Sequence, residues 1–126
     1  MAKKEKEFKP GEYIVNEEKL TVVYAVQSHG VLFTGKANCG PSDTFDVERG
    51  KAIAHIRAVI AQRKFDLGLT VQYIETIKEA LAEVEDLNEG IASPHFMRAI
   101  QTGVEEAKAQ RAHIKDLEAR LAELVK

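Results

Sequence analysis

The chain has 126 residues, of which 44% are hydrophobic and 30% charged, and its formal net charge is −2. This composition is typical of one folded globular domain rather than a disordered chain. The small net charge gives no general attraction to nucleic acid or to an anionic membrane. No apolar run reaches the roughly 20 residues that span a bilayer, and the start "MAKKEKEFKP" lacks the apolar segment of a secretion signal. A single cysteine excludes an internal disulfide, so we expect a cytoplasmic protein.

The first third of the chain predicts a small antiparallel sheet that follows a flexible arm over residues 1–11. Three runs are rich in β-branched and aromatic residues, and a His-Gly pair between the last two predicts a tight hairpin turn. Gly35 within the third run predicts either a bulge or the close approach of another backbone. The three runs are "EYIVN" (12–16), "KLTVVYAVQS" (19–28) and "VLFTGKAN" (31–38), so the sheet is expected over 12–38.

Three helices are predicted after the sheet, because large apolar residues recur every three or four positions. Asp43 and Asp46 are spaced like the N-cap and the N3 carboxylate of the first helix. The isoleucines at 53, 56 and 60 should cover the sheet. The segment "FDLGL" (65–69) predicts either a break between the first and second helices or a kink around Gly68, and we favour the break. The expected ranges are about 44–64, 70–87 and 94–125.

The third helix carries a heptad seam with two weak positions, one a glycine and one a glutamine. A lone helix of this length has little domain to lie against, so we expect the seam to be buried between copies of the chain. The seam residues are Ile100, Gly103, Ala107, Gln110, Ile114, Leu117, Leu121 and Leu124. The predicted fold is therefore one α+β domain over 12–126: a three-stranded antiparallel sheet packed by a helix, then a helical hairpin with a long C-terminal oligomerising helix.

No residue pattern indicates catalysis or metal binding. Cys39 could form a thiol site with His29, His55 or Asp43, but nothing in their spacing brings them together, and an inert cysteine is the alternative. The four histidines show no metal-ligand spacing, and "TGKA" lacks the rest of a Walker loop. We expect no enzyme activity, no metal and no cofactor.

Three strands followed by a helix resemble the second half of a double-stranded-RNA-binding domain, which would indicate a nucleic-acid partner. Such domains begin their last helix with lysines that contact phosphates. The corresponding turn here reads "SDTFDVER" and is acidic. We therefore expect no binding to duplex RNA, and a nucleic-acid-associated regulator remains an alternative only.

The stretch "SPHFMR" (93–98) is the main candidate for ligand binding. Ser93 and the following proline are a typical helix start. The backbone N–H groups of such a start bind phosphate, His95 and Arg98 could add charged hydrogen bonds, and Phe96 could stack on a purine. The alternative is that Phe96 and Met97 belong to the core and that Arg98 is an ordinary surface residue.

Other cations extend this candidate site or suggest a second one. Arg57 lies near the edge of the buried face of its helix, and Arg57 or Asn88 could complete the ligand site. Arg111 and Lys115 are one helical turn apart and form a second candidate anion site. A solvated helix face is the alternative for this pair.

The order of elements, together with the stretch "LFTGKANCGPSDTFDVERGKAIAHIRAVI" (32–60), resembles the phage Thoeris anti-defence proteins of the first type over about residues 12–126. The resemblance implies a sponge that sequesters cyclic ADP-ribose isomers without cleaving them, and in some members also cyclic oligonucleotides at separate sites. It further implies a homo-oligomer, a dimer or a dimer-based hexamer, with pockets where protomers meet, in the cytoplasm of an infected bacterial host. The alternative function is a non-enzymatic helical scaffold whose seam binds a partner protein.

Overall fold

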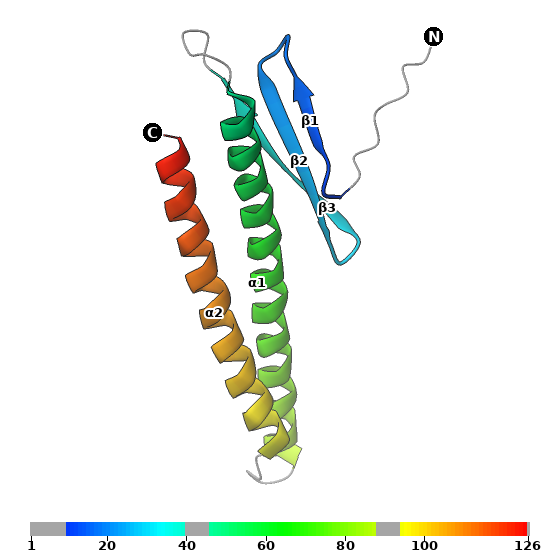
Figure 1. Cartoon of the computed structure of the whole chain (residues 1–126). Coiled ribbons are helices and arrows are strands. Elements are labelled where there is room, and N and C mark those ends of the chain that lie inside the picture. Colours follow the sequence, from blue (N-terminus) through cyan, green and yellow to red (C-terminus); the bar gives the residue numbers. More distant parts are fainter. Residues whose placement is uncertain (1–9, 40–45, 88–93, 126) are drawn as a thin grey trace, which may run out of the picture. The chain divides into compact units, whose positions relative to one another are not determined.

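The computed structural model describes residues 10–39, 46–87 and 94–125, which form two compact units. The first unit holds the described residues up to Gln62 together with those from Asp116 onward, and the second spans Arg63–Lys115. The elements in chain order are β1 (Tyr13–Asn16), β2 (Thr21–Ser28), β3 (Val31–Asn38), α1 (Val47–Leu87) and α2 (Pro94–Leu124) (Figure 1). A three-stranded antiparallel sheet followed by two helices confirms the predicted α+β class.

The sheet of the first unit is an antiparallel meander in the order β1-β2-β3. Ser28 pairs with Val31, so a two-residue loop joins β2 to β3. Both loop residues have positive φ, 51° for His29 and 75° for Gly30. This backbone matches the right-handed twist of the flanking strands and is the commonest geometry for a two-residue hairpin. The predicted turn is therefore confirmed.

Gly35 in β3 marks a close approach of another backbone, one of the two outcomes that the sequence predicted. A Cβ at Gly35 would collide with the backbone of Ala54 and Ala58 in α1 and would lie 2.9 Å from Cβ of Arg57. Both alanines are fully buried. Small residues on both sides thus let the first turns of α1 lie directly against the sheet.

The core of the first unit forms around this contact. Val22, Ala37 and Ala54 are buried together, and Ile53 packs against them from α1. We expected isoleucines to cover the sheet, and Ile53 does contribute. The closest contacts nevertheless come from the alanines, because the backbone of α1 approaches Gly35 so closely that even a Cβ on the strand would collide with it.

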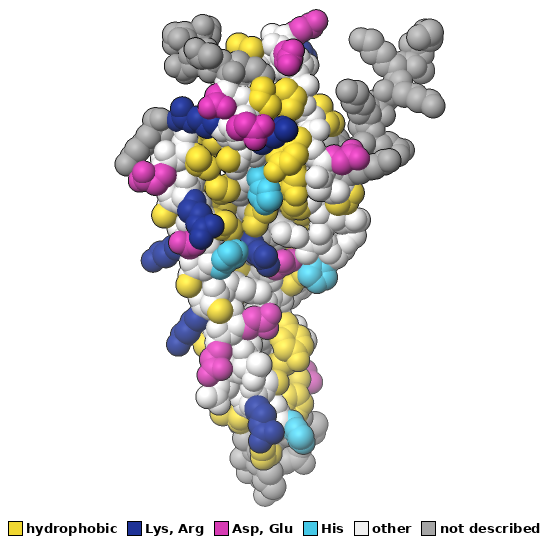
Figure 2. Space-filling model, viewed as in Figure 1, with side chains coloured by type: hydrophobic (Ala, Val, Ile, Leu, Met, Phe, Trp, Pro, Cys, Tyr) yellow, Lys and Arg dark blue, Asp and Glu magenta, His cyan; other side chains and the backbone are white. Residues whose placement is uncertain are grey.

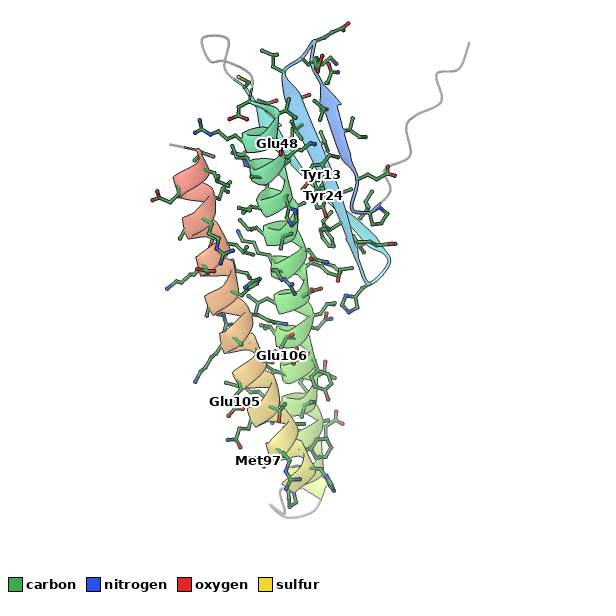
Figure 3. The ribbon with its side chains drawn as sticks, in the orientation of Figure 1. Tyr13, Tyr24, Glu48, Met97, Glu105 and Glu106 are labelled. Carbon is green, nitrogen blue, oxygen red and sulfur yellow. The ribbon has the colours of Figure 1, made fainter. Side chains whose placement is uncertain are left out.

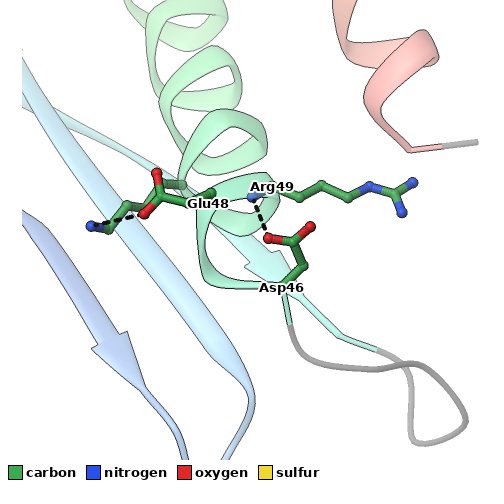
Figure 4. Close-up of polar contacts among 4 residues, drawn as sticks. Asp46, Glu48 and Arg49 are labelled. Carbon is green, nitrogen blue, oxygen red and sulfur yellow. Dashed lines mark hydrogen bonds and ion pairs between the residues drawn. The ribbon is translucent and has the colours of Figure 1, made fainter.

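Asp46 sets the start of α1. Its Oδ1 accepts a hydrogen bond from the backbone N–H of Arg49 at 3.1 Å (Figure 4). Its carbonyl accepts the bond from Gly50 N at 2.9 Å. These are the bonds of an N-cap residue. The predicted role of Asp46 as N3 is therefore wrong, since the helix begins three residues later than expected. Asp43 lies outside the described residues.

α1 continues through the "FDLGL" segment (65–69), so the predicted break and the separate second helix are wrong. Glycine costs a helix only about 1 kcal/mol relative to alanine, and the segment contains no proline. A Cβ at Gly68 would meet nothing within 4 Å, so no packing contact depends on an interruption there. The hydroxyl of Thr70 donates to the carbonyl of Asp66 at 3.1 Å, the i−4 bond that a regular helix offers to threonine.

In the second unit, the later part of α1 packs against the earlier part of α2. Ile74 and Ile77 are buried on α1, and Ala107 and Ile114 are buried on α2. Gly103 allows the close contact, because a Cβ there would lie 2.8 Å from Cγ1 of Ile74.

The middle of the heptad seam of α2 is covered within the chain itself. Ala107, Ile114 and Leu117 are between 2% and 7% exposed in a single copy. These three residues are thus already buried in the single chain, whereas Ile100, Leu121 and Leu124 of the seam are half-buried. Burial of the rest of the seam between protomers stays a prediction. In the first unit, the Nε of Arg49 donates to the carbonyl of Leu124 at 2.7 Å and so binds the last turn of α2.

Candidate functional site

The first turn of α2 brings together three of the predicted ligand residues. The helix begins at Pro94, His95 and Arg98 are exposed, and Phe96 is half-buried. Met97 is 52% exposed, so the alternative that placed it in the core is wrong. The turn thus presents one cation, one imidazole and part of an aromatic ring to solvent. The predicted Ser93 and Asn88 lie outside the described residues.

Arg57 belongs to the first unit, whereas the first turn of α2 belongs to the second. The Nη1 of Arg57 donates to the carbonyl of Lys36 at 2.6 Å. The guanidinium group has five N–H donors in all, and the side chain is exposed. Arg57 is thus bound to β3 through one of its donors, and the predicted ligand residues are divided between the two units.

The second candidate anion site, Arg111 with Lys115, lies on α2 in the second unit, and both residues are exposed. Positive and negative side chains are interspersed over the face seen in Figure 2, with no broad basic patch on that face. The pair is therefore a local feature of one helix surface.

The structure separates Cys39 from His29, one of its candidate partners in a thiol site. Cys39 follows the last residue of β3, and His29 precedes its first residue, so eight residues of extended strand separate them. At about 3.3 Å per residue this distance is roughly 26 Å. His29 Nδ1 lies 2.9 Å from the hydroxyl of Ser28. Among the residues with described positions, no three His, Cys, Asp or Glu side chains gather in a way that could hold a metal ion.

The first unit contains a cluster that the sequence analysis missed. Tyr13 on β1 and Tyr24 on β2 have ring centroids 4.5 Å apart, and the Tyr24 ring stacks on His55 of α1 at 4.6 Å with an interplanar angle of 6°. The Tyr13 hydroxyl lies 3.2 Å from His55 Nδ1. Lys51 Nζ lies 5.5 Å from the centre of the Tyr13 ring. Strand β1 and helix α1 are thus joined through three rings and one ammonium group.

Glu48 contributes the negative charge of this cluster, and Figure 3 shows it near Tyr13 and Tyr24. Its carboxylate lies 3.9 Å from Lys51 Nζ. The pKa of Tyr13 is raised above its ordinary value, first by partial burial and then by the nearby Tyr24 and Glu48. Tyr13 therefore stays a neutral hydroxyl that can donate or accept one hydrogen bond to His55.

Part of this cluster had a signal in the sequence. Lys51 and His55 are one helical turn apart, so they share a helix face. The pairing of Tyr13 with Tyr24 follows once β1 and β2 are in register. What periodicity could not supply is the position of α1 over the sheet, which depends on the contact at Gly35.

No helix in the described part of the chain is long and apolar enough to cross a membrane. Comparisons with protein-family models, with curated proteins and with solved structures found no match to this chain.

Proposed function

We propose that the protein is a phage anti-defence sponge that binds cyclic ADP-ribose isomers, and at separate sites cyclic oligonucleotides, without cleaving them. In this proposal it works in the cytoplasm of an infected bacterium as a homo-oligomer and blocks Thoeris-type immunity. The observation that carries the proposal is the first turn of α2, where His95 and Arg98 are exposed beside the half-buried ring of Phe96.

This turn has the chemistry that a dinucleotide-like anion requires. The backbone N–H groups of a helix start and the positive end of the helix dipole favour a phosphate. Arg98 adds a charge-assisted hydrogen bond, and an aromatic face next to it can stack on adenine. Sequestration needs complementarity to the ligand and no reactive group. The resemblance of the sequence to the anti-defence family narrows the ligand to cyclic ADP-ribose isomers.

A depletion experiment tests the proposal. The protein is incubated with a cyclic ADP-ribose isomer, free ligand is measured after ultrafiltration, and the protein is then denatured by heat. We expect the ligand to disappear from the filtrate and to be recovered intact on heating. Recovery of linear ADP-ribose would show that the protein is an enzyme. Native mass spectrometry of protein from a lysate that finds protein alone would favour the scaffold alternative.

Substitutions in the first turn of α2 test the site itself. Arg98→Ala is expected to weaken binding by about 1.5–3 kcal/mol, the range for hydrogen bonds to charged groups. Lys108→Ala, which removes an exposed cation from the same helix, serves as the matched control. Binding is measured by calorimetry, and a thermal melt of each variant shows that it is folded. Equal affinities for the two variants would remove this turn from the site.

Phe96→Ala distinguishes a stacking ring from a packing ring. Loss of a stacked base costs about 1–3 kcal/mol of binding, whereas truncation of a buried Phe costs about 3–5 kcal/mol of stability. We expect weaker binding with a modest change in melting temperature. A large drop in melting temperature with unchanged affinity would assign Phe96 to the core.

A homo-oligomer would use surfaces other than the buried seam. In the second unit Tyr73 is 58% exposed and Leu69 is 36% exposed, one helical turn apart on α1. The same holds for the scaffold alternative, in which a partner helix would contact α2 outside the three buried seam residues. Sedimentation of wild-type protein and of Tyr73→Asp tests whether this part of α1 joins protomers.

A further inference from the structure

His55 in the first unit is an exposed residue whose imidazole stacks on a tyrosine ring. Tyr24 covers one face of the ring in a nearly parallel stack, 6° from coplanar at 4.6 Å. His55 as a whole is nevertheless exposed. Since Tyr24 covers one face and Tyr13 contacts Nδ1, the opposite face is the one at which we place a ligand. The hydrogen bond between Tyr13 and Nδ1 fixes the orientation of this face.

A cation lies beside this surface. Lys51 precedes His55 by one helical turn, so the two side chains emerge on the same side of α1. The ammonium group lies within cation–π distance of the Tyr13 ring. Its carboxylate partner is Glu48, whose Oε1 lies 3.9 Å from Lys51 Nζ and whose side chain is 87% exposed. An exposed pair of this length is weak, so a stronger anion can replace Glu48 next to Lys51.

We propose that His55, Tyr13 and Lys51 form a binding surface for an aromatic ring that carries a phosphate, as in a nucleoside monophosphate. The aromatic ring stacks on the face of His55 opposite Tyr24, and the phosphate pairs with Lys51. Tyr13 holds the imidazole in place through its hydroxyl. This surface belongs to the first unit, so it is separate from the first turn of α2 and does not depend on the proposed sponge function.

Glu48 gives the proposal a consequence that a purely structural cluster would not have. Its carboxylate competes with the phosphate for Lys51 and repels it. Glu48→Gln removes both effects and keeps the size of the side chain. We therefore expect this variant to bind the phosphorylated ring more tightly than the wild type does.

The test is an NMR titration of the full chain with AMP, adenosine and inorganic phosphate, followed at the ring signals of His55 and Tyr13. AMP is expected to shift both signals saturably, whereas adenosine and phosphate alone each bind roughly tenfold more weakly, since each lacks one contact. Lys51→Met should weaken AMP binding about fivefold, and Glu48→Gln should strengthen it about twofold. Lys108→Met is the matched control and should leave the affinity for AMP unchanged.

Specific results would overturn the proposal. One is the absence of a saturable shift at His55, and another is equal affinity for AMP and inorganic phosphate, which would reduce the site to ion pairing with Lys51. Unchanged AMP binding in Lys51→Met would also refute it, once the thermal melt shows that this variant is folded. AMP shifts confined to His95 would assign binding to the first turn of α2, and Arg98→Ala would then abolish them.

Discussion

At the scale of single residues, Asp46 and Tyr13 each determine a local feature through one hydrogen bond. Asp46 accepts from the N–H of Arg49 and so fixes where α1 begins. Tyr13 bonds to His55 and so ties the edge strand β1 to that helix. The spacing of the two aspartates predicted Asp43 as the N-cap and Asp46 as N3, but the same spacing is also met when the helix begins three residues later and Asp46 is the N-cap. The Tyr13–His55 bond joins residues 42 apart, which no local pattern reveals.

Loss of the Asp46 cap should destabilise the protein measurably. Asp46→Ala leaves the N–H of Arg49 without its partner and is expected to lower the free energy of unfolding by about 0.5–2 kcal/mol. Asp46→Asn keeps an acceptor oxygen and should retain most of the stability. Urea unfolding of the two variants measures the difference. Equal stability of Asp46→Ala and the wild type would show that the cap contributes nothing.

The raised pKa of Tyr13 predicts a loss of stability at alkaline pH. Its ordinary value is 10.0, and the folded chain releases the proton at higher pH than the unfolded chain does. The contribution of Tyr13 to the free energy of unfolding is therefore fully present below pH 10 and is lost as pH rises through its folded-state pKa. Tyr13→Phe should show a flatter decline of unfolding free energy above pH 10. Identical pH profiles for variant and wild type would contradict this assignment.

At the scale of elements, the strands were predictable and the helix boundaries were less so. The third run matches β3 residue for residue, because the His-Gly turn and the alternation of side chains act over a few residues. The break predicted at 65–69 failed because one glycine is a weak signal when both sides favour a helix. The role of a glycine in a helix depends on what lies opposite it. Gly68 faces open space, whereas Gly103 allows the close contact with Ile74.

These two glycines form a matched pair for a test of packing. Gly68→Ala faces open space and should raise the free energy of unfolding by about 0.5–1 kcal/mol through helix propensity. Gly103→Ala places a Cβ 2.8 Å from Cγ1 of Ile74, and the strain of about 1–3 kcal/mol should outweigh that gain. Chemical denaturation of both variants measures the opposite signs. Equal stabilisation by both would mean that Ile74 moves aside at no cost.

At the scale of the whole molecule, the middle of the α2 seam is buried within a single chain, whereas the sequence predicted that it is buried between copies. A heptad pattern predicts that a helix has a partner, but it does not identify that partner as another chain or the same chain. Residues of the candidate ligand site were chosen by chemical type, and the structure divides them between two units. Such a division cannot be read from a sequence, since it depends on which distant segments pack together.

Burial of the middle of the seam within one chain predicts how stability depends on protein concentration. Ile114 is 6% exposed in a single chain, so Ile114→Asp should lower the free energy of unfolding by several kcal/mol. The loss should be the same at low and high protein concentration, because the interface is intramolecular. His113→Asp changes the exposed neighbour and should be tolerated. A loss that protein concentration can reverse would instead place the seam between copies.

The first unit is built from two stretches of chain separated by the whole of the second unit. A unit made of one continuous stretch forms from local contacts and therefore early, whereas a discontinuous one must first close a long loop. During synthesis, residues 63–115 leave the ribosome before residues 116–125, which complete the first unit. We therefore expect the helical hairpin of the second unit to form first, and the sheet unit to become resistant to protease only after the last turns of α2 have emerged.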